Sequence, residues 1–250
     1  MMLFTTQAVL RTNRSMFLEV VAGYFFLLGD IGRYANSWRF CTDHHDKWDN
    51  TVTELRCRAD QVNRAGGVPH AWPYMDALMT GGQGCVPFSH GPHCPGMSDN
   101  AYRTEFALWS LTQSPLIVST DVRVMTPIMN ETLLNAELLA FHASTKTPPG
   151  RRIAIYGCSE PLHCSVWGRP LDETGSDWFV ALVNTGKLNH TIKVSWGDLD
   201  WDHEQPASVR DLWRHQDLPQ AARGTFGAPV PSHGTAAFRI RQQPAGGSGA

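Results

Sequence analysis

The hydrophobic positions in the first half of the chain form short continuous runs that alternate with helix-like patterns. Residues 24–28 and 115–120 are apolar almost throughout, which is typical of strands that are buried on both faces of a sheet. Residues 34–40 predict a further strand, and residues 70–79 predict a strand that runs into a loop. Runs of this kind indicate a parallel sheet, and we expect the apolar stretch at 16–28 to be buried structure.

Helices are predicted between these strands. Residues 46–63, 101–113 and 126–141 each carry large apolar side chains at helical spacing, and the third segment has a leucine-rich face. Strand, loop and helix in repetition indicate an α/β layer or barrel. Functional side chains in such folds follow the strand ends, and the polar residues in those places are Asp30, Arg39, Asp43, Asp76, Asp121 and Arg123.

The pattern changes after the linker-like residues 144–150. Short alternating runs follow, separated by turn residues at regular intervals and without a helical period, which predicts an antiparallel β-sandwich. The expected strands are residues 152–156, 165–169, 178–184, 191–196, 208–213 and 236–241.

Composition excludes some functions. Hydrophobic residues make up 42% of the 250, and the formal net charge is −2 without a basic run, so the electrostatic footprint of a nucleic-acid-binding protein is missing. The apolar stretch at 16–28 is too short for a membrane span and contains Glu19. Most of the nine Trp are expected in the core, although exposed aromatic faces also suit sugar rings.

The cysteines favour an oxidising compartment. Cys85 and Cys94 bracket one loop and Cys158 and Cys164 another, and we expect a disulfide across each, whereas Cys41 and Cys57 have no obvious local partner. Sequons at 13–15, 130–132 and 189–191 agree with secretion as a glycoprotein, although the N-terminus does not have the pattern of a signal peptide.

The densest polar cluster is Asp43-His44-His45-Asp46. Adjacent histidines rarely chelate one ion, so a zinc hydrolase that uses His44 or His45 is a minor alternative, and we expect no metal or other cofactor. Asp46 suits the N-terminal cap of the following helix, and Asp43 lies nearer the strand end. Arg39, four residues before Asp43, is expected either to face a pocket beside two carboxylates or to form a structural ion pair.

Four segments, in this order, resemble the α-galactosidases and α-N-acetylgalactosaminidases of glycoside hydrolase family 27. They are YANSWRFCTDHHDKWDN, WPYMDALMTGGQGC, EFALWSLTQSPLIVSTDVR and LLNAELLAFH, and VPSHGTAAFRI resembles the small β-sandwich of that family. The resemblance implies the C-terminal half of a (β/α)8 TIM barrel over residues 24–145 and a sandwich domain over 146–241. An atypical segment at 1–23 and a disordered tail at 242–250 complete the predicted organisation.

The resemblance also implies roles for single residues. Asp43 matches the general acid/base, Arg39 and Asp76 match residues that bind sugar hydroxyls, and Asp30 stands where the family has a further acidic sugar ligand. Tyr74 stands where the family has another acid. The implied function is a secreted retaining glycosidase that removes terminal α-linked galactose from oligo- or polysaccharides.

The second catalytic carboxylate is the open point. The nucleophile of the family lies on an earlier strand in a Lys-Tyr-Asp-type context, and this sequence has no such segment. We therefore expect the 250-residue chain to be inactive alone. The alternative is a vestigial carbohydrate-binding product of the same fold.

Overall fold

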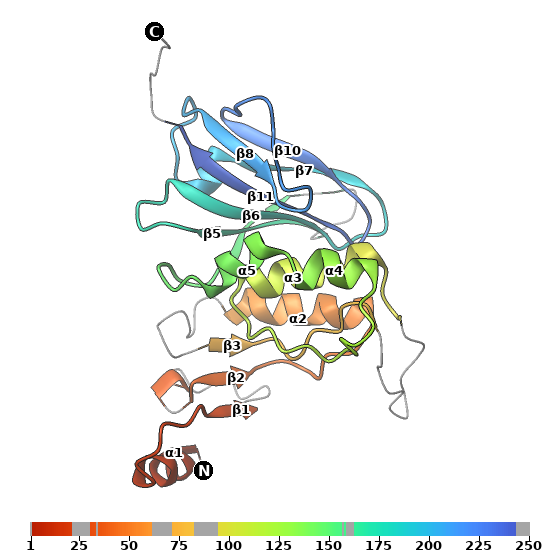
Figure 1. The fold of residues 1–250 in the computed structure, drawn as a ribbon. Coiled ribbons are helices and arrows are strands. Elements are labelled where there is room, and N and C mark those ends of the chain that lie inside the picture. Colours follow the sequence, from red (N-terminus) through yellow and green to blue (C-terminus); the bar gives the residue numbers. More distant parts are fainter. Residues whose placement is uncertain are drawn as a thin grey trace.

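A parallel sheet, a layer of helices and a β-sandwich follow one another through the molecule (Figure 1). The computed structural model of the protein describes residues 2–21, 31–33, 35–61, 72–82, 95–156, 158 and 163–243. The strand predicted at 24–28, Asp30, and the cysteines Cys85 and Cys94 lie outside the described residues, as do residues 244–250 of the predicted tail.

The parallel sheet consists of β1 (Glu19–Val21), β2 (Ser37–Arg39) and β3 (Trp72–Tyr74), in that order. A parallel bridge between Leu78 and Val118 continues it beyond β3. Because β1 pairs with β2, the sheet includes residues 19–21, whereas the sequence predicted that the barrel portion begins at residue 24. The arrangement is part of a barrel, and among the described residues it does not close.

The run at 115–120 is not the buried strand that its sequence predicts. Only the Leu78–Val118 bridge joins it to the sheet, and the side chains of Ile117 and Val118 are 47% and 37% exposed. At the other edge, Val21 is 63% exposed. Apolar residues at both edges thus have no covering layer among the described residues, because burial requires a neighbouring strand or helix that the sequence pattern of one segment does not contain.

Helices α2 (Trp48–Gln61) and α3 (Asp99–Leu111) confirm two of the predicted helices. Ser98 caps α3 by accepting a hydrogen bond from the Ala101 amide. On α3, Phe106 and Trp109 are almost completely buried. They pack with side chains of the sheet, which fixes the helix on the sheet face opposite Arg39.

The helix predicted over 126–141 is in fact two helices, α4 (Pro127–Leu133) and α5 (Ala136–Ala143). Asn135 interrupts the segment because its side chain accepts a hydrogen bond from the Leu138 amide and so begins a new helix. Its amide nitrogen donates to the Leu212 carbonyl at 2.9 Å, which anchors the break on the sandwich.

The sandwich confirms the predicted antiparallel architecture. A six-stranded sheet of order β4-β5-β6-β11-β8-β9 faces a two-stranded sheet, β10-β7. Its strands are β4 (Arg151–Tyr156), β5 (Cys164–Pro170), β6 (Asp177–Asn184), β7 (His190–Ser195), β8 (Ala207–Asp211), β9 (Gln216–Asp217), β10 (Thr225–Val230) and β11 (Thr235–Gln242). The sequence pattern did not predict β9 or β10.

Strand β11 extends past the predicted end of the sandwich domain. Gln242 belongs to β11, and the Gln243 amide donates to the Pro206 carbonyl, so the strand runs past the predicted domain end at 241. The remaining short elements are α1 (Met2–Arg11) and the 3-10 helices η1 (Ile31–Arg33) and η2 (Trp196–Leu199). Within the described parts, none of the helices has the length and apolar character that crossing a membrane requires.

Strand β6 belongs to two hydrophobic cores. Phe179, Ala181 and Val183 pack with the helices and the parallel sheet, whereas Val180 and Leu182 pack inside the sandwich. Successive side chains of a strand point to opposite faces, so a strand with helices on one side and a sheet on the other buries every residue. The helix layer and the sandwich are therefore joined by a continuous apolar interface.

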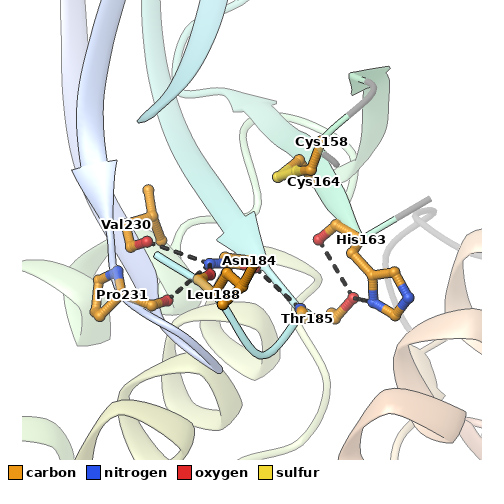
Figure 2. The surroundings of a disulfide bond; sticks show 9 residues. Cys158, His163, Cys164, Asn184, Thr185, Leu188, Val230 and Pro231 are labelled. Carbon is orange, nitrogen blue, oxygen red and sulfur yellow. Dashed lines mark hydrogen bonds between the residues drawn. A yellow bond between two sulfur atoms is a disulfide. The ribbon is translucent and has the colours of Figure 1, made fainter. Parts of the chain in front are cut away.

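Two disulfides lie among the described residues. The predicted bond between Cys158 and Cys164 is present at the start of β5, next to the turn where Asn184 donates to the carbonyl groups of Leu188 and Pro231 (Figure 2).

The second disulfide joins Cys41 and Cys57, which have no obvious partner in the sequence. It links the segment after β2 to α2. The pairing depends on how α2 folds back on the sheet, which Cys spacing does not reveal.

Candidate active site

The two segments that carry Asp43 and Asp76 leave the sheet at the same edge. Arg39 is the last residue of β2 and Tyr74 the last of β3, and the parallel register places them side by side. The carboxyl ends of neighbouring parallel strands thus bring together Arg39, Asp43 and Asp76, which lie up to 37 positions apart in the sequence.

Arg39 lies between the two carboxylates. Its Nη2 is 2.6 Å from Asp43 Oδ1, and its Nη1 is 2.7 Å from Asp76 Oδ2. Burial lowers the pKa of Arg39, but the charges of Asp76 and Asp43 more than offset this and raise its pKa above the usual value. The guanidinium is therefore permanently charged and keeps two acids on one side of the sheet.

The exposures of these side chains differ. The Asp43 side chain is 67% exposed, whereas those of Arg39 and Asp76 are 21% and 17% exposed. Asp43 is thus open to a molecule from solvent, and the other two form the partly buried floor beneath it.

Asp76 is held in an unusual backbone conformation. Its φ is 68°, in the left-handed region that Asp tolerates better than most residues. The His44 amide donates to Asp76 Oδ2 at 3.0 Å, and the Trp109 indole donates to the Asp76 carbonyl at 2.8 Å. Three elements therefore fix its position: β2, the loop after it and α3.

The histidines of the polar cluster do not gather around a metal-binding position. The His44 ring is buried and lies 2.8 Å from Glu105 Oε1. Within the described residues, the only group of three possible ligands close enough for one ion is Cys158, Cys164 and His190, and there the two sulfurs form a disulfide.

Asp46 is not the helix cap that its position suggests. It is buried and accepts hydrogen bonds from the Gly96 amide and the Tyr102 hydroxyl, both at 2.7 Å. Burial raises the pKa of Asp46, and the hydrogen bonds oppose this effect. It connects the loop after β2 to the start of α3, because the loop turns inward before α2 begins at Trp48.

Three acids near the site were not singled out from the sequence. Glu105 and Glu54 are buried in α3 and α2, and their positions within helical patterns conceal them. Burial raises the pKa of Glu54 to about 7.

The third acid is Glu19 on β1. Alternation along β1 and the register with β2 and β3 place Glu19 on the sheet face of Arg39 and Tyr74. Burial raises the pKa of Glu19, the charge of Asp76 raises it further, and Arg39 opposes the shift. A charged residue inside an apolar strand was the available sequence signal.

Other predicted strand-end groups lie elsewhere. Asp121 and Arg123 pair with each other at 2.6 Å, and Arg123 is 86% exposed. They make no contact with Arg39, Asp43 or Asp76 among the interactions of the described residues. The site that the structure assembles is therefore the triplet Asp43, Arg39 and Asp76, with Tyr74 and Glu19 on the same face.

Comparison with known families covers both parts of the chain. Residues 25–144 match the family described as "Alpha galactosidase A", and residues 163–240 match the "Alpha galactosidase C-terminal beta sandwich domain". Among curated proteins, α-galactosidase 3 of Arabidopsis thaliana is 32% identical over 198 residues, which is 79% of this chain and 41% of that protein. The α-galactosidase of Coffea arabica is 28% identical over 83% of this chain and 49% of its own length.

Solved structures show the same fold. A family 27 β-L-arabinopyranosidase from Geobacillus stearothermophilus has a TM-score of 0.83 at 23% identity, over 100% of this chain and 55% of its own. α-Galactosidase I from Mortierella vinacea has a TM-score of 0.73 at 20% identity, over 94% of this chain and 60% of its own. The chain thus spans about half the length of the relatives it matches, and it belongs to glycoside hydrolase family 27, the α-galactosidase family.

Proposed function

We propose that the chain carries the acid/base side of a retaining α-galactosidase-type site, with Asp43 as the proton-transferring residue. The observation that carries this proposal is the position of Arg39 between Asp43 and Asp76, at 2.6 and 2.7 Å. An exposed acid beside a partly buried Arg–Asp pair can reach a glycosidic oxygen while the pair binds hydroxyl groups of the same sugar.

In the proposed reaction a carboxylate attacks the anomeric carbon while Asp43 donates its proton to the leaving oxygen. Water then displaces that carboxylate from the anomeric carbon, Asp43 takes the proton from the water, and the sugar is released with its configuration retained. Such a reaction needs two carboxyl groups about 5–5.5 Å apart. We assign Asp43 to one of them, and we assign the nucleophile to none of the described residues.

Arg39 and Asp76 are proposed as the sugar-binding residues. Arg39 offers N–H donors in a fixed fork, and Asp76 offers an acceptor already oriented by the His44 amide. The proposed substrates are terminal α-galactosides of oligo- or polysaccharides. The names of the curated relatives, α-galactosidases, support the galactoside part of this proposal.

We also propose that the protein is secreted and glycosylated. The disulfides Cys41–Cys57 and Cys158–Cys164 support an oxidising compartment. Asn13, Asn130 and Asn189, the sequon asparagines, are all exposed. Mass measurement of the secreted chain before and after enzymatic removal of N-glycans tests this.

Binding of galactose to the purified chain tests the site without requiring turnover. We expect saturable binding by NMR titration that is weakened at least about tenfold in Arg39→Lys and in Asp76→Asn, because each loses a charged hydrogen bond. Asp43→Asn should still bind, because its proposed role is proton transfer. Arg123→Lys, which changes an exposed ion pair, is the matched control. Equal binding by all four variants would contradict the assignment.

Turnover distinguishes the complete site from the vestigial alternative. We expect the chain alone to bind galactose without hydrolysing p-nitrophenyl α-galactoside, because no nucleophile is assigned to it. Hydrolysis that Asp43→Asn abolishes would show instead that the chain contains both carboxylates, and Glu19→Gln would then be the next variant. Absence of both binding and hydrolysis would contradict the proposed function.

A further inference from the structure

Buried ionisable groups anchor the loop that carries Asp43 on both sides of that residue. On one side, the Thr42 hydroxyl donates to Glu54 Oε1 at 3.1 Å. On the other, His44 Nε2 lies 2.8 Å from Glu105 Oε1. Neither interaction involves the side chain of Asp43. Both hold the residues on either side of it and so restrain the backbone of the loop.

Glu105 is the centre of the second anchor. Its side chain is fully buried, as is that of His44. Besides His44, it accepts hydrogen bonds from the Met79 amide at 2.7 Å and the Thr80 hydroxyl at 2.6 Å. One carboxylate on α3 therefore ties the loop after β2 to the turn that follows Asp76.

The His44 ring also packs against the Trp109 ring in a tilted arrangement. The Trp109 ring lies 5.0 Å away, and the Trp109 indole donates to the Asp76 carbonyl. The His44 amide donates to the Asp76 carboxylate. The ring and the backbone of one residue thus connect α3 to the floor of the site.

The charges around His44 come from every element that packs on it. Glu105 belongs to α3, Glu54 to α2 and Asp46 to the same loop. Arg39 and Asp76 act on Glu54 from the sheet. His44 Nδ1 and Glu54 Oε2 are buried without a hydrogen-bond partner among the described residues.

Such a cluster is not the arrangement that stability alone favours. Buried ionisable groups cost free energy unless each is fully paired, and well-packed apolar side chains in the same place are often as stable or more so. A cluster with this cost, directly beside the exposed Asp43, is better explained by positioning.

We propose that His44 with Glu105, and Glu54 with Thr42, are positioning residues that hold the Asp43 segment against Arg39 and fix the His44 amide on Asp76. The consequence for catalysis rests on the proposed function, but the positioning itself is a property of the fold. It can therefore be measured without a substrate.

The test compares Glu105→Gln with wild type by two local measurements. We expect hydrogen exchange of the His44 amide to become at least about tenfold faster, and the carboxyl ¹³C resonance of Asp76 to move at fixed pH, because its N–H donor is loosened. The amides of Val180 and Leu182 in the sandwich should keep their exchange rates. Glu131→Gln, which breaks the Arg103–Glu131 pair between α3 and α4, is the matched control.

The same samples are titrated with galactose, which separates the two proposals. Local changes together with weakened binding support both of them. If the local changes occur but the wild-type protein does not bind galactose, the positioning proposal stands and the proposed function is contradicted. If the exchange rate of the His44 amide and the Asp76 carboxyl resonance are unchanged in Glu105→Gln, the positioning proposal is overturned, whether or not galactose binds.

A milder variant keeps the test decisive if Glu105→Gln does not fold. Thr42→Val removes the hydroxyl that donates to Glu54 and accepts a long hydrogen bond from Asn50 Nδ2. We expect the amides of Asp43 and His44 to exchange at least about threefold faster, with sandwich amides unchanged. A general loss of protection throughout the molecule, rather than in this loop, would show a merely structural role and overturn the proposal.

Discussion

At the scale of single residues, the site depends on acids whose environments differ sharply. Asp43 is largely exposed, Asp76 is held by three donors, and Glu54 is completely buried. Burial raises the pKa of Glu54 to about 7, with His44 and Thr42 opposing the shift. Burial within the fold, rather than residue type, therefore sets the pKa of Glu54.

Glu54 makes stability depend on pH. Its pKa in the folded chain, about 7, is above the ordinary 4.5, so the folded state binds the proton more tightly than the unfolded state. The stabilising effect is complete below pH 4.5 and is lost as pH rises through 7, a decrease of about 3 kcal/mol.

We expect Glu54→Gln to remove this component. Urea unfolding at pH 5 and pH 7.5 should show a smaller decrease in the variant than in wild type. Glu173→Gln, at an exposed position, is the control and should follow wild type. An identical pH dependence in Glu54→Gln and wild type would contradict the assignment.

The sequence predicted part of this site. Arg39, Asp43 and Asp76 follow strand ends, and a parallel sheet must bring such positions to one edge. Glu54 and Glu105 lie on helices, where a polar residue in an amphipathic pattern normally faces solvent. Their burial follows from how α2 and α3 pack on the loop between them and the sheet.

At the scale of elements, the disulfides make unequal contributions. Cys41–Cys57 spans 16 positions and joins a loop to α2, whereas Cys158–Cys164 spans 6 within one hairpin. A longer closed loop removes more conformational freedom from the unfolded chain. Replacing both cysteines of the first bond by Ala should cost about 3 kcal/mol, and of the second about 2 kcal/mol. Urea unfolding of the two double variants measures both losses of stability. A larger loss for the Cys158–Cys164 variant would contradict the prediction.

Asn135 decides that residues 127–143 form two helices. Asn135→Ala removes the cap of α5 and leaves the buried Leu212 carbonyl without its donor. We expect a loss of about 2–3 kcal/mol, about 1–2 of it from the cap. Asn130→Ala, at an exposed position of α4, should cost far less. Thermal unfolding followed by circular dichroism compares the two variants, and equal destabilisation would show that Asn135 is not the interruption.

At the scale of the whole molecule, Arg169 joins the helix layer to the sandwich. It is fully buried in β5, and it donates to the carbonyl groups of Phe141 at 2.6 Å and Pro148 at 3.1 Å. Burial lowers the pKa of Arg169 to about 10. The residue pairs with carbonyl groups at the end of α5 and in the linker after it.

We expect Arg169→Met to uncouple the two parts. The variant removes the donor from the buried Thr147 carbonyl, at a cost of about 1–3 kcal/mol, and from the partly buried carbonyls of Phe141, Ser144 and Pro148. Unfolding of wild type should be one transition, and that of Arg169→Met should occur earlier and separate into two by tryptophan fluorescence and circular dichroism. Arg151→Met, at an exposed position, is the control. Coincident transitions in Arg169→Met would contradict a joining role.

The sequence by itself determined the order of architectures, the two disulfide cysteines at the β5 hairpin, and the strand-end triplet Arg39, Asp43 and Asp76. The architectures and the hairpin cysteines follow from local periodicity and short sequence separations. The triplet follows from the rule that a parallel sheet brings its strand ends to one edge, although Arg39 and Asp76 lie 37 positions apart.

Tertiary structure alone decided the Cys41–Cys57 bond, the inward turn of Asp46 and the burial of Glu54 and Glu105. It also decided that residues 115–120 stay partly exposed, although their composition is that of a buried strand. An apolar run indicates only that burial of its side chains is favourable. Whether they are buried depends on which other elements pack on them.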